Sequence, residues 1–264
     1  MTDCIKTKTL LKANNIQLSY AGKTILRDIN FCIKDIVRPG MQQGQVVSLI
    51  GRSGIGKTQL FKILSGLQKP TAGAVTINED EPVKAGDMGV IFQNYYLFEW
   101  RTVGQSLQLA AKQNASLKGK EKEMIAQYAA DFQLTDELQK YPQQLSGGQR
   151  QRASIIQQLL KGSNFLLLDE PFSGLDVCVL DKVTDLLLQV SVSDELKTLI
   201  IVSHDISTSV AISDTVLIMG NENGKLGATI KKEIDLVERD LAWQKDIKKE
   251  KAFIETVEEI KACL

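Results

Sequence analysis

The 264-residue sequence has few cysteines, a single histidine and no long apolar run. Its four cysteines lie far apart and form no C-x-x-C pair, which disfavours a metal or disulfide framework and fits a reducing cytosol. No run approaches the roughly 18 apolar residues of a membrane span. The first ten residues also lack the apolar core of a signal peptide. We therefore expect a chain that neither crosses a membrane nor is exported.

The sequence also has no excess of charge of either sign. Lys plus Arg and Asp plus Glu each total 32 residues, so the formal net charge is zero. This balance argues against a generic basic surface for nucleic acid, and no nucleic-acid partner is expected. The apolar content of 43% is typical of a globular protein with a sizeable core.

Residues 51–58, G-R-S-G-I-G-K-T, fit the phosphate-binding loop pattern G-x-x-x-x-G-K-[ST]. An apolar run leads into the loop and a helix-compatible run leaves it, which is the context that the motif needs. Its glycines let successive N–H groups point at an anion. Lys57 supplies a point charge for the outer phosphates, and the Thr58 hydroxyl can ligate Mg²⁺. The proposed cradle comprises Gly51, Ser53, Gly54, Gly56, Lys57 and Thr58.

Two buried strands are expected to end in groups able to carry out chemistry. The apolar run 165–168 precedes Asp169 and Glu170, and the run 198–202 precedes His204. Carboxyl ends of parallel strands are where α/β sheets bind ligands. Asp169 can hold Mg²⁺ there, and Glu170 can act as a general base on water. A lone histidine is more often structural, but this position favours a functional role.

Other segments leave alternatives open. Residues 14–35 predict two strands around a turn, and Tyr20 ends the first. Tyr20 alone is better explained as an edge aromatic than as a stacking platform for a base. Residues 35–44 predict a loop, and a strand over 88–92 leads to Gln93.

Helical spacing over 103–132 indicates a helical insert, and a further helix is expected near 179–190. Tyr95–Trp100 is either core or a partner-docking surface. Leu145–Gln149 precedes a helix and is either a second anion site or a plain cap formed by Ser146. The residues after 224 are expected to be charged and mostly helical, and to pack on the flank of the domain.

The order of these motifs, with L-S-G-G-Q at 145–149 and S-G-L-D at 173–176, resembles the ATP-binding cassette ATPase family over about residues 14–220. The resemblance implies an α/β phosphate-loop NTPase core with a mainly parallel sheet, an N-terminal antiparallel β-subdomain and a helical insert. It implies one domain over 1–224, with the helical subdomain at about 94–160 inserted in a RecA-like core. Residues 225–264 would form a tail.

The resemblance also implies ATP and Mg²⁺ as cofactors, with roles for individual residues. Lys57 would grip the β- and γ-phosphates, Glu170 would polarise the attacking water and His204 would contact the γ-phosphate. Tyr20 would stack on adenine. Mg²⁺ would be held by Thr58, Gln93 and Asp169.

Partners follow from the same resemblance. Ser146, Gly148 and Gln149 would cap the ATP held by a second copy, with Asp176 at the interface, so that two chains dimerise head to tail around two ATP molecules. A transmembrane permease would dock near Tyr95–Trp100 and connect the chain to a substrate-binding protein. The chain would then lie on the cytoplasmic face of the membrane.

Trp100–Val103 resembles the corresponding stretch of nitrate/sulfonate/taurine-type importer cassettes. Three departures stand against this assignment: an extra segment near 35–42, Gln59 in place of a small hydroxyl residue, and the run Ile156–Leu159. The alternatives are an exporter or lipoprotein-releasing cassette and a soluble cassette ATPase of DNA repair or translation. The soluble class usually carries two cassettes or a long coiled coil, and a phosphate-loop kinase would not explain L-S-G-G-Q.

Overall fold

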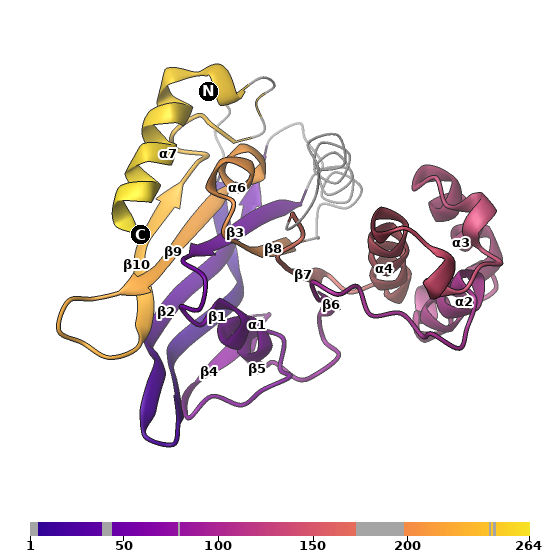
Figure 1. The fold of residues 1–264 in the computed structure, drawn as a ribbon, viewed down its shortest axis with the longest axis horizontal. Helices are drawn as coiled ribbons and strands as arrows, with labels where there is room; N and C mark the ends of the chain where they lie inside the picture. The colour runs from indigo at the N-terminus through magenta and orange to yellow at the C-terminus, as the bar shows by residue number, and fades with distance from the viewer. Residues whose placement is uncertain (1–4, 39–43, 79, 173–197, 243, 245–246) are drawn as a thin grey trace.

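The computed structural model describes residues 5–38, 44–78, 80–172, 198–242, 244 and 247–264. Within these ranges, ten strands form one sheet in the order β5-β4-β1-β2-β10-β9-β3-β8-β7-β6 (Figure 1). One half of the sheet is antiparallel, because β1 pairs with β2 on one side and β4 on the other. Its strands are β1 (Ile5–Tyr20), β2 (Lys23–Val37), β4 (Ala72–Ile77) and β5 (Glu81–Pro82).

The other half contains the parallel strands. β3 lies between β8 and β9 and is parallel to both, and β7 is parallel to β8 and β6. Every residue of β3, β7 and β8 is buried, which explains their nearly continuous apolar sequences. The strands are β3 (Gln45–Gly51), β6 (Gly89–Ile91), β7 (Phe165–Asp169), β8 (Thr198–Ser203) and β9 (Thr215–Asn221).

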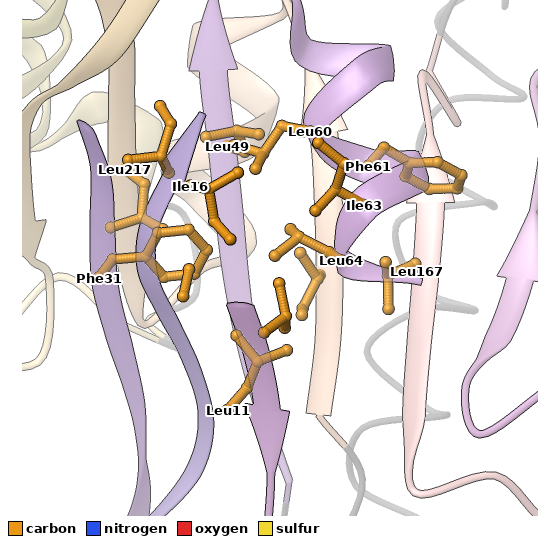
Figure 2. Packing of buried hydrophobic residues seen from close by; sticks show 14 of the residues in the cluster. Leu11, Ile16, Phe31, Leu49, Leu60, Phe61, Ile63, Leu64, Leu167 and Leu217 are labelled. Carbon is orange, nitrogen blue, oxygen red and sulfur yellow. The ribbon is translucent and has the colours of Figure 1, made fainter. Parts of the chain in front are cut away.

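Helix α1 (Lys57–Leu64) packs its apolar face on this sheet. Figure 2 shows Phe61 and its neighbours in α1 beside leucines of β3 and β7 and apolar residues of β1 and β2. Each fully buried Leu, Ile or Phe side chain stabilises the fold by about 1.5–3 kcal/mol relative to exposure. The packing therefore fixes the start of α1, and with it the glycine loop, at the edge of the sheet. The buried α1 residues in the cluster are Leu60, Phe61, Ile63 and Leu64.

Three α-helices occupy the chain between β6 and β7 and lie together at one end of the molecule (Figure 1). They are α2 (Val103–Gln113), α3 (Glu121–Asp131) and α4 (Gly147–Lys161), as the periodic pattern predicts. α2 begins where Thr102 and Gln105 form a reciprocal capping box. α4 ends at Gly162, whose φ of 79° suits glycine.

The prediction that the residues after 224 are mostly helical was wrong. β10 (Ala228–Asp235) pairs antiparallel with β9 and meets β2 at Ala228, so it joins the two halves of the sheet. A bulge between Ile230 and Lys232 interrupts the alternation that would have marked a strand.

The expected C-terminal helix is present as α7 (Lys251–Cys263), which packs beside α6 (Ile206–Ile212). Its buried face includes Phe253, Val257 and Ile260. Ile254, on the same helix, is 51% exposed and lies outside this face.

The predicted loop at 35–44 also needs correction, because β2 continues to Val37. Arg38 is buried, and its guanidinium pairs with the buried Asp214 and donates to the carbonyl of Gly44. Asp214 also accepts from the N–H of Val46, which anchors β3. The helix expected near 179–190 and the S-G-L-D stretch at 173–176 lie outside the described residues.

Candidate nucleotide site

The glycine loop connects β3 to α1 and needs glycine for steric reasons. Gly56 has φ 110°, and a Cβ there would lie 3.0 Å from Cδ2 of Leu26. Gly51 ends β3, where a Cβ would lie 3.0 Å from the carbonyl oxygen of Met219. Nζ of Lys57 donates to the carbonyls of Gly51 (2.8 Å) and Arg52 (3.2 Å) and is buried. The ammonium group is therefore held against the first residues of the glycine loop.

Asp169 ends β7 and is only 7% exposed. Burial, followed by the neighbouring negative charge of Glu170, raises the pKa of Asp169 above its ordinary value. A hydrogen bond with the Thr58 side chain opposes this shift. Its Oδ1 is buried and has no hydrogen-bond partner among the described residues. An orphaned carboxylate oxygen beside a hydroxyl group is suited to a hard cation.

Glu170 has φ 51°, an uncommon conformation for a residue with a side chain. Its backbone N–H donates to the carbonyl of Val202 (2.8 Å), which ties it to β8. Its Oε2 lies 2.7 Å from Nδ1 of His204 and 3.3 Å from the backbone nitrogen of that residue. Its Oε1 lies 3.5 Å from Nζ of Lys57. Glu170 thus contacts groups that follow the carboxyl ends of the neighbouring strands β3 and β8.

These groups face a cavity of about 550 Å³. Tyr20, at the end of β1, contributes a ring that is 50% exposed, and Gln93 contributes from the residues after β6. The structure therefore brings most of the predicted site residues to one cavity. Its lining residues are Tyr20, Ile25, Ser53, Gly54, Gly56, Lys57, Thr58, Gln59, Gln93, Glu170 and His204.

The predicted second anion site is elsewhere. Oγ of Ser146 accepts from the N–H of Gln149, and the Gln149 side chain accepts from the N–H of Ser146. The capping box at the N-terminus of α4 is therefore complete within the chain. The Gln149 amide also donates to Glu137 (2.9 Å). Ser146, Gly148 and Gln149 do not line the cavity around Lys57. Asp176 lies outside the described residues.

The aromatic segment Tyr95–Trp100 combines both predicted environments. Tyr95 and Leu97 pack against the core of the helical region. Tyr96 and Trp100 are 67% and 73% exposed. The segment is therefore anchored on one side and presents large apolar groups on the other.

A glycine loop, a buried lysine and paired carboxylates at the end of one parallel strand define a phosphate-loop nucleoside triphosphatase. The ABC transporter family model matches residues 35–173. YtlC of Bacillus subtilis, an uncharacterised ABC transporter ATP-binding protein, is 36% identical over 80% of this chain and 79% of its own length. The chain belongs to the ABC transporter ATP-binding family, binds ATP and is an ATPase.

Two further comparisons support the family and its fold. The aliphatic sulfonates import ATP-binding protein SsuB 2 of Pseudomonas syringae pv. tomato is 34% identical, covering 79% of this chain and 81% of its own. The dimeric structure of the cassette MJ0796 bound to ADP and Pi superposes with a TM-score of 0.69 at 24% identity. That match covers 86% of this chain and 99% of the other.

Some site residues could not be predicted from their own sequence surroundings. Ile25 lines the cavity, but in the sequence nothing distinguishes it from the other apolar residues of its strand. Gln59 could be noticed because it replaces a small hydroxyl residue directly after Thr58. Gln68 contacts Tyr20 across 48 positions of sequence, and no local pattern marks it.

Proposed function

We propose that the chain is the ATP-hydrolysing subunit of a membrane importer and drives a permease as a head-to-tail dimer around two ATP molecules. The observation that carries the proposal is the meeting of Lys57, Glu170 and His204 at one cavity, beside the orphaned oxygen of Asp169. Import is favoured by similarity to a protein named for sulfonate import.

In this proposal Lys57 neutralises the β- and γ-phosphates. Glu170 accepts a proton from the attacking water, and its contact with His204 orients both side chains. His204 contacts the γ-phosphate from a position that is largely exposed before a partner arrives. Tyr20 stacks on the base, and Gly51, Ser53, Gly54 and Gly56 provide backbone close to the phosphates.

Mg²⁺ fits the residues present. Thr58, Asp169 and Gln93 would hold it, together with phosphate oxygens, as is usual for a cation that binds few protein carboxylates. The ion would neutralise phosphate charge when bound. The lack of a hydrogen-bond partner for Oδ1 of Asp169 supports this assignment.

The dimer would complete the site. Ser146 is exposed and does not line its own chain's cavity, and Gly148 and Gln149 follow it at the N-terminus of α4. Helix N-termini favour anions, so this end of α4 is suited to the γ-phosphate bound by a second copy. Asp176 would lie at the same interface. The dimeric arrangement named for MJ0796 supports the model.

The permease would dock on Tyr95–Trp100. The exposed side chains of Tyr96 and Trp100 would provide apolar surface for a helix of the permease. A substrate-binding protein would act through the permease. No helix in the described parts of the chain combines the length and hydropathy needed to cross a membrane. We place the chain on the cytoplasmic face, with 1–224 as the ATPase domain, the helical subdomain at about 94–160 and 225–264 as an adjoining segment.

The proposal is tested by affinity purification of the chain from detergent-solubilised membranes, followed by identification of stoichiometric partners. We expect one polytopic membrane protein, which should be lost when Tyr96 and Trp100 are both replaced by serine. Recovery of DNA-repair or ribosomal proteins in its place would support a soluble cassette and contradict the proposal. Phosphate release from Mg-ATP by the purified chain tests the ATPase separately.

A further inference from the structure

The hydroxyl of Tyr20 is held from two sides by glutamines. Nε2 of Gln68 donates to the hydroxyl (2.7 Å), which donates in turn to Oε1 of Gln59 (3.1 Å). A hydroxyl that both accepts and donates holds the far end of its ring in place. The ring is nevertheless half exposed and lines the nucleotide cavity. The polar end of the side chain is therefore restrained while its apolar surface stays accessible.

The turn that carries Gln68 is itself fixed. The backbone N–H of Gln68 donates to the carbonyl of Lys62 in α1 (3.1 Å). Further along, the N–H of Thr71 donates to the carbonyl of Gln17 (2.7 Å), and Oγ1 of Thr71 accepts from the N–H of Ser19 (3.0 Å). Hydrogen bonds therefore join the turn after α1 to the end of β1 and keep Gln68 beside Tyr20.

We propose that Gln68 is a positioning residue for the nucleobase, acting through the hydroxyl of Tyr20. This inference rests on the proposed function, in which Tyr20 stacks on adenine. A ring that is oriented before the nucleotide arrives loses less freedom on binding, so the affinity rises. Gln59 also bonds to the Tyr20 hydroxyl, but it lines the cavity, whereas Gln68 does not line it. Gln68 therefore allows positioning to be separated from direct contact.

The test is a double-mutant cycle on ADP affinity, measured by calorimetry with Mg²⁺ present. Gln68→Leu should weaken ADP binding by about 3- to 10-fold, the worth of one hydrogen bond. Tyr20→Phe should weaken it at least as much, because it also removes the bond to Gln59. The double variant should bind ADP no more weakly than Tyr20→Phe alone, because without the hydroxyl Gln68 has no bond left to lose. Gln113→Leu, on α2 and away from the cavity, is the matched control and should bind as the wild type does.

Steady-state kinetics distinguish positioning from general damage. Gln68→Leu should raise the KM for ATP while kcat is retained, because the lost interaction is equal in the ground and transition states. Additive losses in the cycle, a fall in kcat, or wild-type affinity in Gln68→Leu would each overturn the positioning role. If Gln68→Leu does not fold, Gln68→Asn replaces it, because it keeps the amide but withdraws it from the hydroxyl.

The inference and the proposed function fail differently. A wild-type chain that bound no ADP would overturn both. A chain that bound ADP, with Gln68→Leu indistinguishable from it, would overturn the positioning role alone. In that case Tyr20 would be held by Gln59 or by ring packing.

Discussion

At the scale of single residues, Glu170 is the most constrained group of the site. Its backbone is strained, and its side chain meets His204 and Lys57. We predict that Glu170→Gln keeps ATP binding but lowers hydrolysis by about 10²–10⁴-fold, because a general base is lost while the shape is kept. Phosphate release and ATP affinity measure the two effects. Glu123→Gln, an exposed carboxylate on α3, should hydrolyse ATP normally. Near-wild-type hydrolysis by Glu170→Gln would remove the general-base role.

The charged form of Asp169 lowers the stability of the folded chain. Because burial and Glu170 raise the pKa of Asp169, the folded state binds its proton more tightly than the unfolded state does. The free energy of unfolding of the wild type therefore rises as the pH falls from the raised pKa of Asp169 toward the ordinary value of 3.8. We predict that Asp169→Asn raises the free energy of unfolding at neutral pH by about 1 kcal/mol.

The extra free energy of unfolding of Asp169→Asn should shrink as the pH is lowered and vanish below pH 3.8. Urea titrations in EDTA at several pH values measure it, with Asp136→Asn as an exposed control. The same variant should lose Mg²⁺-dependent hydrolysis. A destabilised Asp169→Asn at neutral pH would contradict the assignment of a buried, poorly compensated charge.

At the scale of elements, the predictable parts are those whose signal is local. β7 and β8 were predicted from apolar runs, and the catalytic candidates followed because they end those strands. β10 was missed because a bulge and three exposed charged residues hide its period. The partners of Arg38 and Tyr20 could not be foreseen, since Asp214 and Gln68 are distant in sequence and come close only in the fold.

Helix α7 is attached to β10 by a charged cluster. Glu259 accepts from Arg239 and Lys232, and these bonds lower the pKa of Glu259 to about 2. Its contribution to stability is present above pH 4.5 and is lost as pH falls through about 2. We predict that Glu259→Gln lowers the free energy of unfolding by ~1 kcal/mol at pH 7, a modest value because the cluster is partly solvated.

Denaturant titration of Glu259→Gln against Glu255→Gln checks this prediction. Glu255 is on the same helix, but its pair with Lys251 is largely exposed, so its loss should cost little. The difference between the two variants should narrow as the pH falls below 4.5. Equal stabilities at pH 7 would mean that apolar packing alone holds α7.

At the scale of the whole molecule, the exposed N-terminus of α4 and the cavity around Lys57 are separate parts of one chain. We predict that Glu170→Gln forms a dimer in saturating Mg-ATP, because ATP bound between copies stabilises the pair by mass action and is not removed. Ser146→Arg in the same background should prevent it by placing bulk at the interface. Gel filtration with light scattering measures both.

The control is Ser163→Arg, just before β7 and away from the N-terminus of α4, which should still dimerise. Circular dichroism verifies that Ser146→Arg keeps its helices, since loss of the cap alone costs about 1 kcal/mol. A monomer of Glu170→Gln at saturating Mg-ATP would contradict the shared site.

The two outermost strands of the described sheet are its shortest: β5 has two residues and β6 has three. An edge strand offers unpaired N–H and C=O groups to any neighbouring chain, and a short edge offers few. Strand addition, which would lock two copies together regardless of nucleotide, is thereby discouraged. The short edge strands therefore leave any association between copies to other surfaces of the molecule.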